Sequence, residues 1–328
     1  MTTLTKNGIA VAGTVIVDKI NEISAYPQSG ELTQILNLEV AVGGCVPNVA
    51  LDLKKISPEI SIRAIGAIGD DEEGAYVRKI LEGGNVDASG LTVKNGQRTS
   101  FTEVMSIPGG QRTFFTYAGS GAQFGLADMR YGDQLPEILH LGYFLLLEKV
   151  DNGDGVEILK DAKAKGIRTS IDLVSENSDR YHLVLPCLPY TDYLIINELE
   201  ASKLTGISPE NENLCKIAAK LRQLGVKEKV IIHKPDCAVC LSDEGFTFIP
   251  SYSLPAGYIK GTTGAGDAFC AGALIGIYKG WADAEILSFA SGCAVMALGS
   301  PDATSGLTTL QEIRDFCQQF SRQNVKEK

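Results

Sequence analysis

The chain has 328 residues, 44% of them hydrophobic, so it can bury a sizeable core and is slightly large for one ordinary domain. Its formal net charge of −10 argues against nucleic acid and anionic membranes as partners, because both require clustered positive charge. The first residues lack the features of a signal peptide, and no run reaches the roughly 18 apolar residues of a membrane span. We expect a soluble, cytoplasmic protein.

Short apolar runs alternate with amphipathic segments of helical period along most of the chain. The predicted strands lie at 8–17, within 137–147, and at 167–173, 192–198 and 229–234, and the predicted helices lie at 74–84, 153–165 and 213–225. Short buried strands that alternate with such helices indicate βαβ units and a mainly parallel sheet with helices on both faces. The predicted fold class is therefore α/β.

Two segments interrupt this alternation, at about 15–42 and 99–124. In the second, "TSFTEVMSIPGGQRTFFTYAG" alternates with period two around a Pro-Gly-Gly turn, which is typical of a β-hairpin. We interpret both segments as a small β-sheet that leaves the main domain and returns to it, so that residues 1–328 form a single domain. A sheet at the edge of a ligand cleft is a candidate lid.

The eight cysteines are scattered through apolar contexts rather than spaced as a disulfide framework, so most are expected to be reduced core residues. Cys237 and Cys240 have the spacing of a metal site, and His233 is close by in sequence. No second CxxC accompanies them, and the alternation of a β-strand explains the pair better than zinc does.

A glycine-rich loop in "IKGTTGAGDAF" precedes a helix predicted from about Asp267 to Tyr278. At a helix N-terminus, amides without intrahelical partners and the helix dipole favour an anion. Because glycine permits close backbone approach, the amides of Gly264, Ala265 and Gly266 can converge on one group of oxygens. Asp267 is then either an ordinary helix cap or a base beside that anion. The loop lacks the lysine of a P-loop.

Other polar and glycine-rich segments precede this loop along the chain. They are Asp18 in "GTVIVD", Gly43, Gly44 and Asn48 in "VGGCVPNVALDL", "IGAIGDDEEG" at 65–74, and Asn197 and Glu200 in "NELEASKLTG". With "TTGAGD" at 262–267, they make the chain resemble the ribokinase-like (PfkB-type) carbohydrate kinases along nearly its whole length. The resemblance implies a three-layer α/β/α sandwich with a mainly parallel sheet and a small β-sheet lid.

The resemblance also implies a reaction and its site. ATP with Mg²⁺ would phosphorylate a primary hydroxyl of a neutral pentose or hexose, such as ribose or fructose, and Asp267 would act as the base beside an anion hole formed by Gly264, Ala265 and Gly266. The remaining roles are sugar binding by Asp18, Gly43, Gly44 and Asn48, nucleotide binding by Asn197, Thr262, Gly264, Gly266 and Ser291, and magnesium binding through water by Asn197 and Glu200. An amide and a carboxylate three residues apart suit magnesium, although they also suit a capped helix start.

Some positions depart from the family pattern. Gly261 stands where relatives have an aspartate associated with a monovalent-cation site, which argues against potassium activation. Pro235 and Asp236 replace a glycine-containing turn, and Ser291 stands where many relatives have an asparagine near the adenine. The resemblance therefore predicts nucleotide preference less directly than it predicts phosphotransfer.

Two alternative functions remain open at this stage. A nucleoside kinase of the same family would use the lid aromatics Phe101, Phe114 and Phe115 to stack on a base, although such residues also simply pack a lid. A non-catalytic relative would bind sugar or nucleotide and signal through a partner. In either case, alternating apolar residues in the lid predict a homodimer formed through it.

Overall fold

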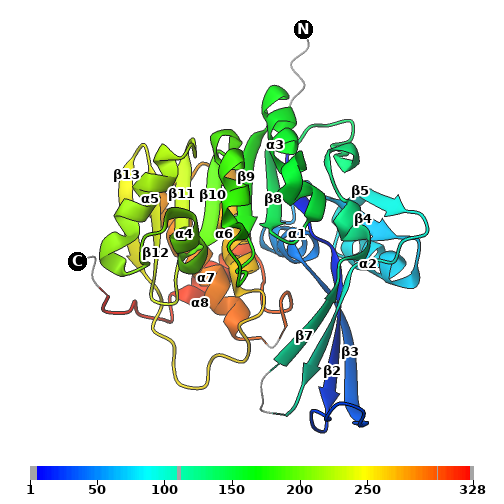
Figure 1. Ribbon diagram of the computed structural model, residues 1–328. Coiled ribbons are helices and arrows are strands. Elements are labelled where there is room, and N and C mark those ends of the chain that lie inside the picture. The colour runs from blue at the N-terminus through cyan, green and yellow to red at the C-terminus, as the bar shows by residue number, and fades with distance from the viewer. Residues whose placement is uncertain (1–5, 109–111, 301, 326–328) are drawn as a thin grey trace.

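The computed structural model describes residues 6–108, 112–300 and 302–325, which form a large α/β body and a small sheet that projects from it (Figure 1). Within these residues the main sheet has nine strands in the order β13-β12-β11-β10-β9-β8-β1-β4-β5. Neighbouring strands are parallel from β11 to β5, whereas β12 runs antiparallel to both of its neighbours. The strands are β1 (Ile9–Gly13), β4 (Ile62–Gly69), β5 (Asp87–Lys94), β8 (Ile138–Phe144), β9 (Arg168–Leu173), β10 (Tyr193–Asn197), β11 (Lys229–His233), β12 (Cys237–Ser242) and β13 (Gly245–Pro250).

Helices cover both faces of the main sheet. One face packs against α1 (Cys45–Ile56), α2 (Glu72–Gly83), α6 (Ala265–Tyr278), α7 (Asp283–Leu298) and α8 (Leu310–Cys317), and the other against α3 (Gly155–Ala164), α4 (Glu198–Thr205) and α5 (Leu214–Gln223). Irregular helical turns occupy Gly119–Gln123, Leu126–Asp128, Val150–Asp154, Arg180–Tyr190 and Asn211–Asn213. None of the helices in the described ranges is long and apolar enough to cross a membrane.

The two hydrophobic cores explain the apolar runs in the sequence. All five residues of β1 and the first five of β8 are buried, because helices cover both faces of these strands. Figure 1 shows α3, α4 and α5 in front of the sheet, with α1 and α6 behind it. The predicted α/β class with a mainly parallel sheet is confirmed.

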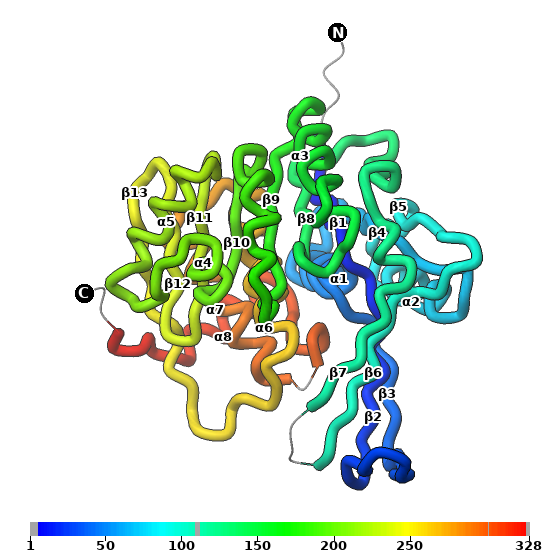
Figure 2. Tube along the Cα trace, viewed as in Figure 1, coloured from blue at the N-terminus to red at the C-terminus, as the bar shows by residue number. Residues whose placement is uncertain are grey.

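The small sheet has the strand order β3-β2-β6-β7. Its strands are β2 (Ile16–Ile23), β3 (Ile35–Gly43), β6 (Phe101–Ser106) and β7 (Arg112–Tyr117), and only the central pair β2 and β6 is parallel. The tube in Figure 2 shows these strands extending away from the body as one arm. The Pro-Gly-Gly turn predicted between β6 and β7 lies partly outside the described residues.

The structure differs from the predicted elements in several places, and two of them are informative. The opening run at 8–17 is divided between β1 and β2, which belong to different sheets. The edge strand β5 was not predicted, because "DASGLTVK" lacks a continuous apolar run. Parallel strands place their carboxyl ends at one edge of a sheet, so β8, β9, β10 and β11 all end where α1 and α6 begin.

Candidate active site

The loop before α6 has the geometry of an anion-binding turn. Gly264 precedes the helix with φ +80°, and a Cβ there would lie 2.5 Å from the Cα of Ala303, so the position requires glycine. No side chain caps the first turn of α6. The amide of Ala265 donates to the carbonyl of Thr262 at 3.4 Å, a long hydrogen bond that closes the loop. The positive end of a 14-residue helix is therefore available to a negatively charged group.

Asp267 lies in the first turn of α6 but does not cap the helix. Its carboxylate accepts a hydrogen bond from Nδ2 of Asn48 at 2.9 Å, and the hydroxyl of Tyr143 lies 3.0 and 2.9 Å from its two oxygens. Burial, assisted by the charge of Asp172, raises the pKa of Asp267 to about 7, while both hydrogen bonds act to lower it. A buried carboxyl group with a pKa near neutrality is suited to accept a proton.

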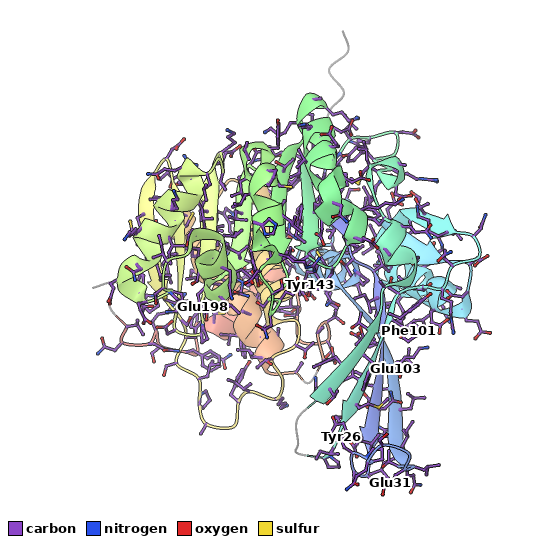
Figure 3. All side chains as sticks on the ribbon, viewed as in Figure 1. Tyr26, Glu31, Phe101, Glu103, Tyr143 and Glu198 are labelled. Atoms are coloured by element: carbon purple, nitrogen blue, oxygen red, sulfur yellow. The ribbon has the colours of Figure 1, made fainter. Side chains whose placement is uncertain are left out.

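Two pockets meet beside Asp267. The inner pocket has a volume of about 170 Å³ and the outer pocket about 730 Å³, which is within the usual range for small-molecule sites. The outer pocket opens beside Glu198, which Figure 3 labels together with Tyr143 at this edge of the body. Among the sequence-predicted residues, Asn197, Glu200, Gly264, Gly266 and Asp267 line the inner pocket, and Asn197, Thr262, Ala265, Gly266 and Ser291 line the outer one.

Asn197 and Glu200 form a reciprocal cap at the start of α4. The Asn197 side chain accepts from the Glu200 amide at 2.9 Å, and Glu200 Oε2 accepts from the Asn197 amide at 3.1 Å. Glu200 Oε1 accepts from the side chains of Ser175 and Asn197, at 2.9 and 2.8 Å. Burial raises the pKa of Glu200 to about 8. The capped-helix interpretation is therefore correct as local structure, and the same two side chains also line the inner pocket.

The predicted sugar-binding residues lie where the small sheet joins the body. Asp18 is on β2, and a Cβ on Gly43 would collide with its carboxylate, so the two residues are in contact. Gly44 caps α1 with φ +85°, and a Cβ there would lie 2.7 Å from the carbonyl oxygen of Thr14. Burial raises the pKa of Asp18 to about 6. Asn48 is the residue of this group that contacts Asp267 directly.

Two of the positions that depart from the family pattern lie at the outer pocket. Pro235 and Ser291 both line it, as does His233, whose ring packs on Phe269 with centroids 4.6 Å apart. Burial lowers the pKa of His233 to about 4, so its imidazole is neutral at physiological pH. On this side the outer pocket therefore has a neutral imidazole beside the charged side chain of Lys234.

The small sheet reaches the same region through its outer strand. Nη1 of Arg112 on β7 donates to the hydroxyl of Thr263 at 3.4 Å, one residue before Gly264. In Figure 3, Phe101 and Glu103 lie along the arm, and Tyr26 and Glu31 lie at its far end.

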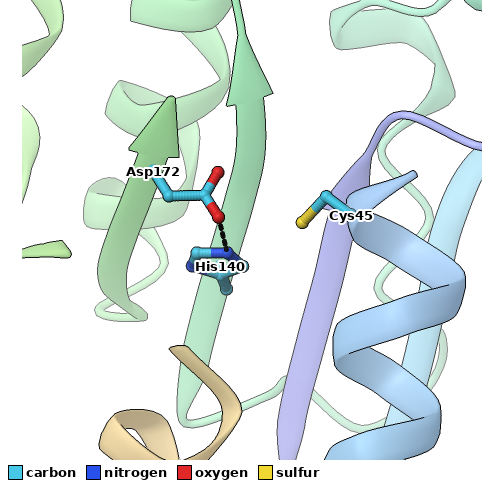
Figure 4. A group of neighbouring side chains, drawn as sticks. All are labelled: Cys45, His140 and Asp172. Carbon is cyan, nitrogen blue, oxygen red and sulfur yellow. Dashed lines mark ion pairs between the residues drawn. The ribbon is translucent and has the colours of Figure 1, made fainter. Parts of the chain in front are cut away.

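The sequence analysis did not identify three polar residues beneath this site. Tyr143 and Asp172 stand at the carboxyl ends of β8 and β9, and His140 lies within β8. Figure 4 shows His140 and Asp172 with Cys45 of α1 beside them, and the three donor groups lie within 4.8 Å of one another. Their position at the ends of parallel strands, where ligands bind in such sheets, was the signal available in the sequence.

Two members of this cluster, His140 and Asp172, have hydrogen-bond partners within the protein. His140 Nε2 lies 3.3 Å from Asp172 Oδ2, and His140 Nδ1 lies 3.0 Å from the hydroxyl of Ser170. The other oxygen of Asp172 accepts from the amide of Tyr143 at 2.6 Å. We therefore interpret the cluster as a hydrogen-bond network that supports Tyr143 rather than as a metal site.

Comparisons with known proteins agree with this architecture. The model of the pfkB family carbohydrate kinases matches residues 9–310. A ribokinase of Arabidopsis thaliana is 26% identical over 88% of this chain and 76% of its own length, and a fructokinase of Vibrio alginolyticus is 26% identical over 94% and 99%.

Solved structures of known proteins share the fold of this chain. A structure of Arabidopsis thaliana ribokinase complexed with ribose and ATP superimposes with a TM-score of 0.81 at 22% identity, covering 96% of this chain and 99% of that one. Because the family model covers most of the chain, the protein belongs to the pfkB carbohydrate kinases, phosphotransferases that act on sugar hydroxyls.

Proposed function

We propose that this protein is an ATP-dependent kinase that phosphorylates a primary hydroxyl of a neutral pentose or hexose, with Asp267 as the base. The observation that carries the proposal is the buried carboxylate of Asp267 in the first turn of α6, in contact with Asn48 and beside two joined pockets. Similarity to a ribokinase and a fructokinase supports a neutral sugar as the acceptor.

ATP would occupy the outer pocket, with its phosphates directed to the inner one. Thr262 and Ser291 line the outer pocket, and Gly264 lines the inner one. Both pockets include Asn197 and Gly266, so a nucleotide could pass its triphosphate from one to the other at these residues. With ATP in this orientation, the transferred phosphoryl group would lie next to Asp267.

The inner pocket also fits a magnesium ion. Its lining includes side-chain oxygens of Asn197 and Glu200, which are ligands of the hard type that Mg²⁺ prefers. Because the oxygens of Glu200 already accept hydrogen bonds within the helix cap, these residues would hold the ion through water. The ion would neutralise charge on the nucleotide phosphates.

The chemical step would use few groups. Asp267 accepts the proton of the sugar hydroxyl as its oxygen bonds to the γ-phosphorus, and the bond from that phosphorus to the β-γ bridging oxygen breaks to release ADP. Backbone amides at Gly264, Ala265 and Gly266 stabilise the charge on the transferring oxygens. The carboxylate of Asp18 and the amide of Asn48 bind sugar hydroxyls, while Gly43 and Gly44 let the ligand lie against the backbone.

The small sheet would act as the lid of this site. Asp18 lies on β2 of this sheet, and Arg112 on β7 contacts Thr263, which joins the arm to the anion-binding turn. Closure over the acceptor would exclude water and so limit hydrolysis of ATP.

A second copy of the chain would cover the exposed face of the arm. Apolar side chains on β3 and β7 are about half exposed, including Leu38 at 59%, Phe114 at 61% and Phe115 at 57%. Exposed apolar side chains on both edge strands of the small sheet favour association. We propose a homodimer formed through the small sheet.

The test is coupled ADP release from purified protein with ATP and Mg²⁺ over a panel of pentoses, hexoses, sugar acids, sugar phosphates and nucleosides. We expect turnover on a neutral sugar, and we expect Asp267→Asn to lower kcat by about 10²–10⁴-fold or more with little change in substrate binding. Asp243→Asn changes an exposed carboxylate far from the pockets and is the matched control.

Three outcomes would contradict the proposal in different ways. Turnover only on nucleosides would favour a nucleoside kinase. Silence across the panel with nucleotide still bound would favour a non-catalytic relative. Near-normal turnover by the Asp267→Asn protein would remove Asp267 as the base.

A further inference from the structure

Tyr143 has a backbone conformation that is unusual for an aromatic residue. Its φ is +60°, in the left-handed region, and the pairing of β8 with β9 is irregular between Leu141 and Phe144. A non-glycine residue in this region is strained, and such strain persists only where surrounding contacts impose it. The contacts of Tyr143 therefore indicate the role of its strained conformation.

A chain of hydrogen bonds holds the Tyr143 backbone in place. Its amide donates to Asp172 Oδ1 at 2.6 Å, and Asp172 Oδ2 faces His140 Nε2 at 3.3 Å. The ring of His140 is fully buried and is fixed in turn by the hydroxyl of Ser170 at 3.0 Å. Figure 4 shows the pair of Asp172 and His140 between adjacent strands. None of these four residues belongs to the motifs that relate the chain to its family.

The result of this arrangement is that the Tyr143 hydroxyl reaches Asp267. It lies 3.0 and 2.9 Å from the two carboxylate oxygens. The side chain of Asn48, on helix α1, donates a second hydrogen bond to one of these oxygens. The carboxylate is thus fixed by one donor from the sheet and one from a helix. Two fixed donors hold a carboxylate in one orientation better than one does, because each limits its rotation.

We propose that Tyr143 is a positioning residue that orients the Asp267 carboxylate for proton abstraction through its phenolic hydroxyl. The inference rests on the proposed function of Asp267 and deepens it. One role then accounts for the strained backbone, the Asp172 contact and the His140 network. Together they hold this hydroxyl within hydrogen-bond distance of Asp267.

The surroundings of Asp267 explain why such support is needed. Most titratable groups that face it are acidic or neutral, and a negative neighbour disfavours the ionised carboxylate. From the elements packed around it these groups are Cys45 and Asp52 on α1, Tyr143 on β8, Asp172 on β9 and Cys270 on α6 itself, with Glu200 of α4 and His233 of β11 across the inner pocket. Burial, together with the charge of Asp172, disfavours the ionised form of Asp267, and hydrogen bonds from Asn48 and Tyr143 offset part of this effect.

The first test is the pH profile of kcat/KM for Tyr143→Phe with the best acceptor from the panel. Because the hydroxyl stabilises the ionised carboxylate, we expect the acid limb of the profile to move to higher pH and kcat at neutral pH to fall about tenfold. The KM for ATP should change less than kcat, since Tyr143 lines the inner pocket but not the outer pocket that would hold the rest of the nucleotide. An unchanged acid limb and an unchanged kcat would overturn the proposal.

Tyr278→Phe is the matched control. Tyr278 lies at the far end of α6, the helix that carries Asp267, and its hydroxyl contacts Asn7 and the Gly8 amide. The substitution removes that hydroxyl. This variant should keep the profile of the unmodified protein. Circular dichroism and the thermal midpoint of each variant show whether it is folded, and a shifted acid limb in a folded Tyr143→Phe protein separates positioning from a loss of structure.

A second measurement keeps the inference testable if no acceptor is turned over. Protein with ¹³C-labelled aspartate carboxyl groups is titrated by NMR, and the resonance missing from Asp267→Asn identifies Asp267. A midpoint that moves to higher pH in Tyr143→Phe supports the contact, and an unmoved midpoint overturns it. Failure of the proposed function would appear as absent turnover in every variant, whereas failure of this inference would appear as identical titrations.

Discussion

The body and the small sheet differ in what their sequences must satisfy. In the body, strands such as β1 and β10 are buried almost throughout, so packing fixes both their residues and the positions of the groups at their ends. In the small sheet, every residue of β7 and the first six of β3 are exposed. The body can therefore hold catalytic groups in a fixed geometry, while the arm is free to vary in the contacts that it makes with an acceptor or with another chain.

After Asp267→Asn, the largest expected effect comes from the rigid part of the site. Gly264→Ala would place a methyl group against Ala303 at a residue with φ +80°, so the anion-binding turn must distort. We predict a loss in kcat of about 10²-fold or more, comparable to the removal of an oxyanion donor. Steady-state kinetics of the folded variant measure this loss. A kcat within twofold of that of the unmodified protein would show that the turn tolerates a side chain at residue 264 and is not rigidly constrained.

A charge on the arm should disrupt association without unfolding the body. Leu38→Glu replaces a side chain that is 59% exposed on β3. If a second copy covers this surface, the dimer should weaken about tenfold or more by sedimentation velocity, with the thermal midpoint little changed. Val93→Glu, at a 43% exposed position on the body strand β5, is the control and should leave the dimer intact. A monomeric unmodified protein would refute the proposed interface.

The two lid arginines offer a finer test of how the arm meets the body. Arg112 contacts Thr263 beside the anion-binding turn, whereas Arg98 lies over the ring of Phe101 and 3.7 Å from Glu73. We predict that Arg112→Ala lowers kcat about threefold to tenfold and that Arg98→Ala changes it less, because only the first contact reaches the site. Equal effects of the two variants would argue against a specific role for the Arg112 contact.

The smallest effect concerns stability and its dependence on pH. The folded-state pKa of Asp267 is raised to about 7 from its usual 3.8, so its contribution to stability is present below about pH 4 and is lost as the pH rises through 7. Asp267→Asn removes the buried charge, and we predict that it stabilises the protein at pH 8 by roughly 1–3 kcal/mol, or a few degrees. Thermal melts at pH 4 and pH 8 measure this. A gain that is the same at both pH values would contradict the assigned cause.

Sequence reasoning found those features of the molecule whose signals are local. Alternation of short apolar strands with amphipathic helices predicted the main sheet, and the glycines at 264 and 266 predicted a backbone turn at the start of α6. Asn197 and Glu200 were assigned to magnesium or to a helix cap, and the cap was the part that the structure could confirm.

Other features depend on contacts between distant segments and left little trace in the sequence. Tyr143 and Asp172 each stand in a mainly buried strand that contains other polar residues as well, so neither is marked out by the sequence. Their importance comes from a hydrogen bond that joins Tyr143 to Asp267, 124 residues away in the chain. The positive φ of Tyr143 has no sequence signal either, because it is imposed by the network of Asp172 and His140.

The central claim is that phosphate is transferred to a primary sugar hydroxyl with Asp267 as the base. Proton-coupled ³¹P NMR of the purified protein with ATP, Mg²⁺ and its acceptor tests it most directly. We expect the γ-phosphate signal to be replaced by a phosphomonoester triplet, split by the two protons of a CH₂ group, in equal amount to ADP and formed more slowly, by about a hundredfold or more, with Asp267→Asn. Inorganic phosphate in place of the ester, or an ester signal that the variant forms at the normal rate, would contradict this mechanism.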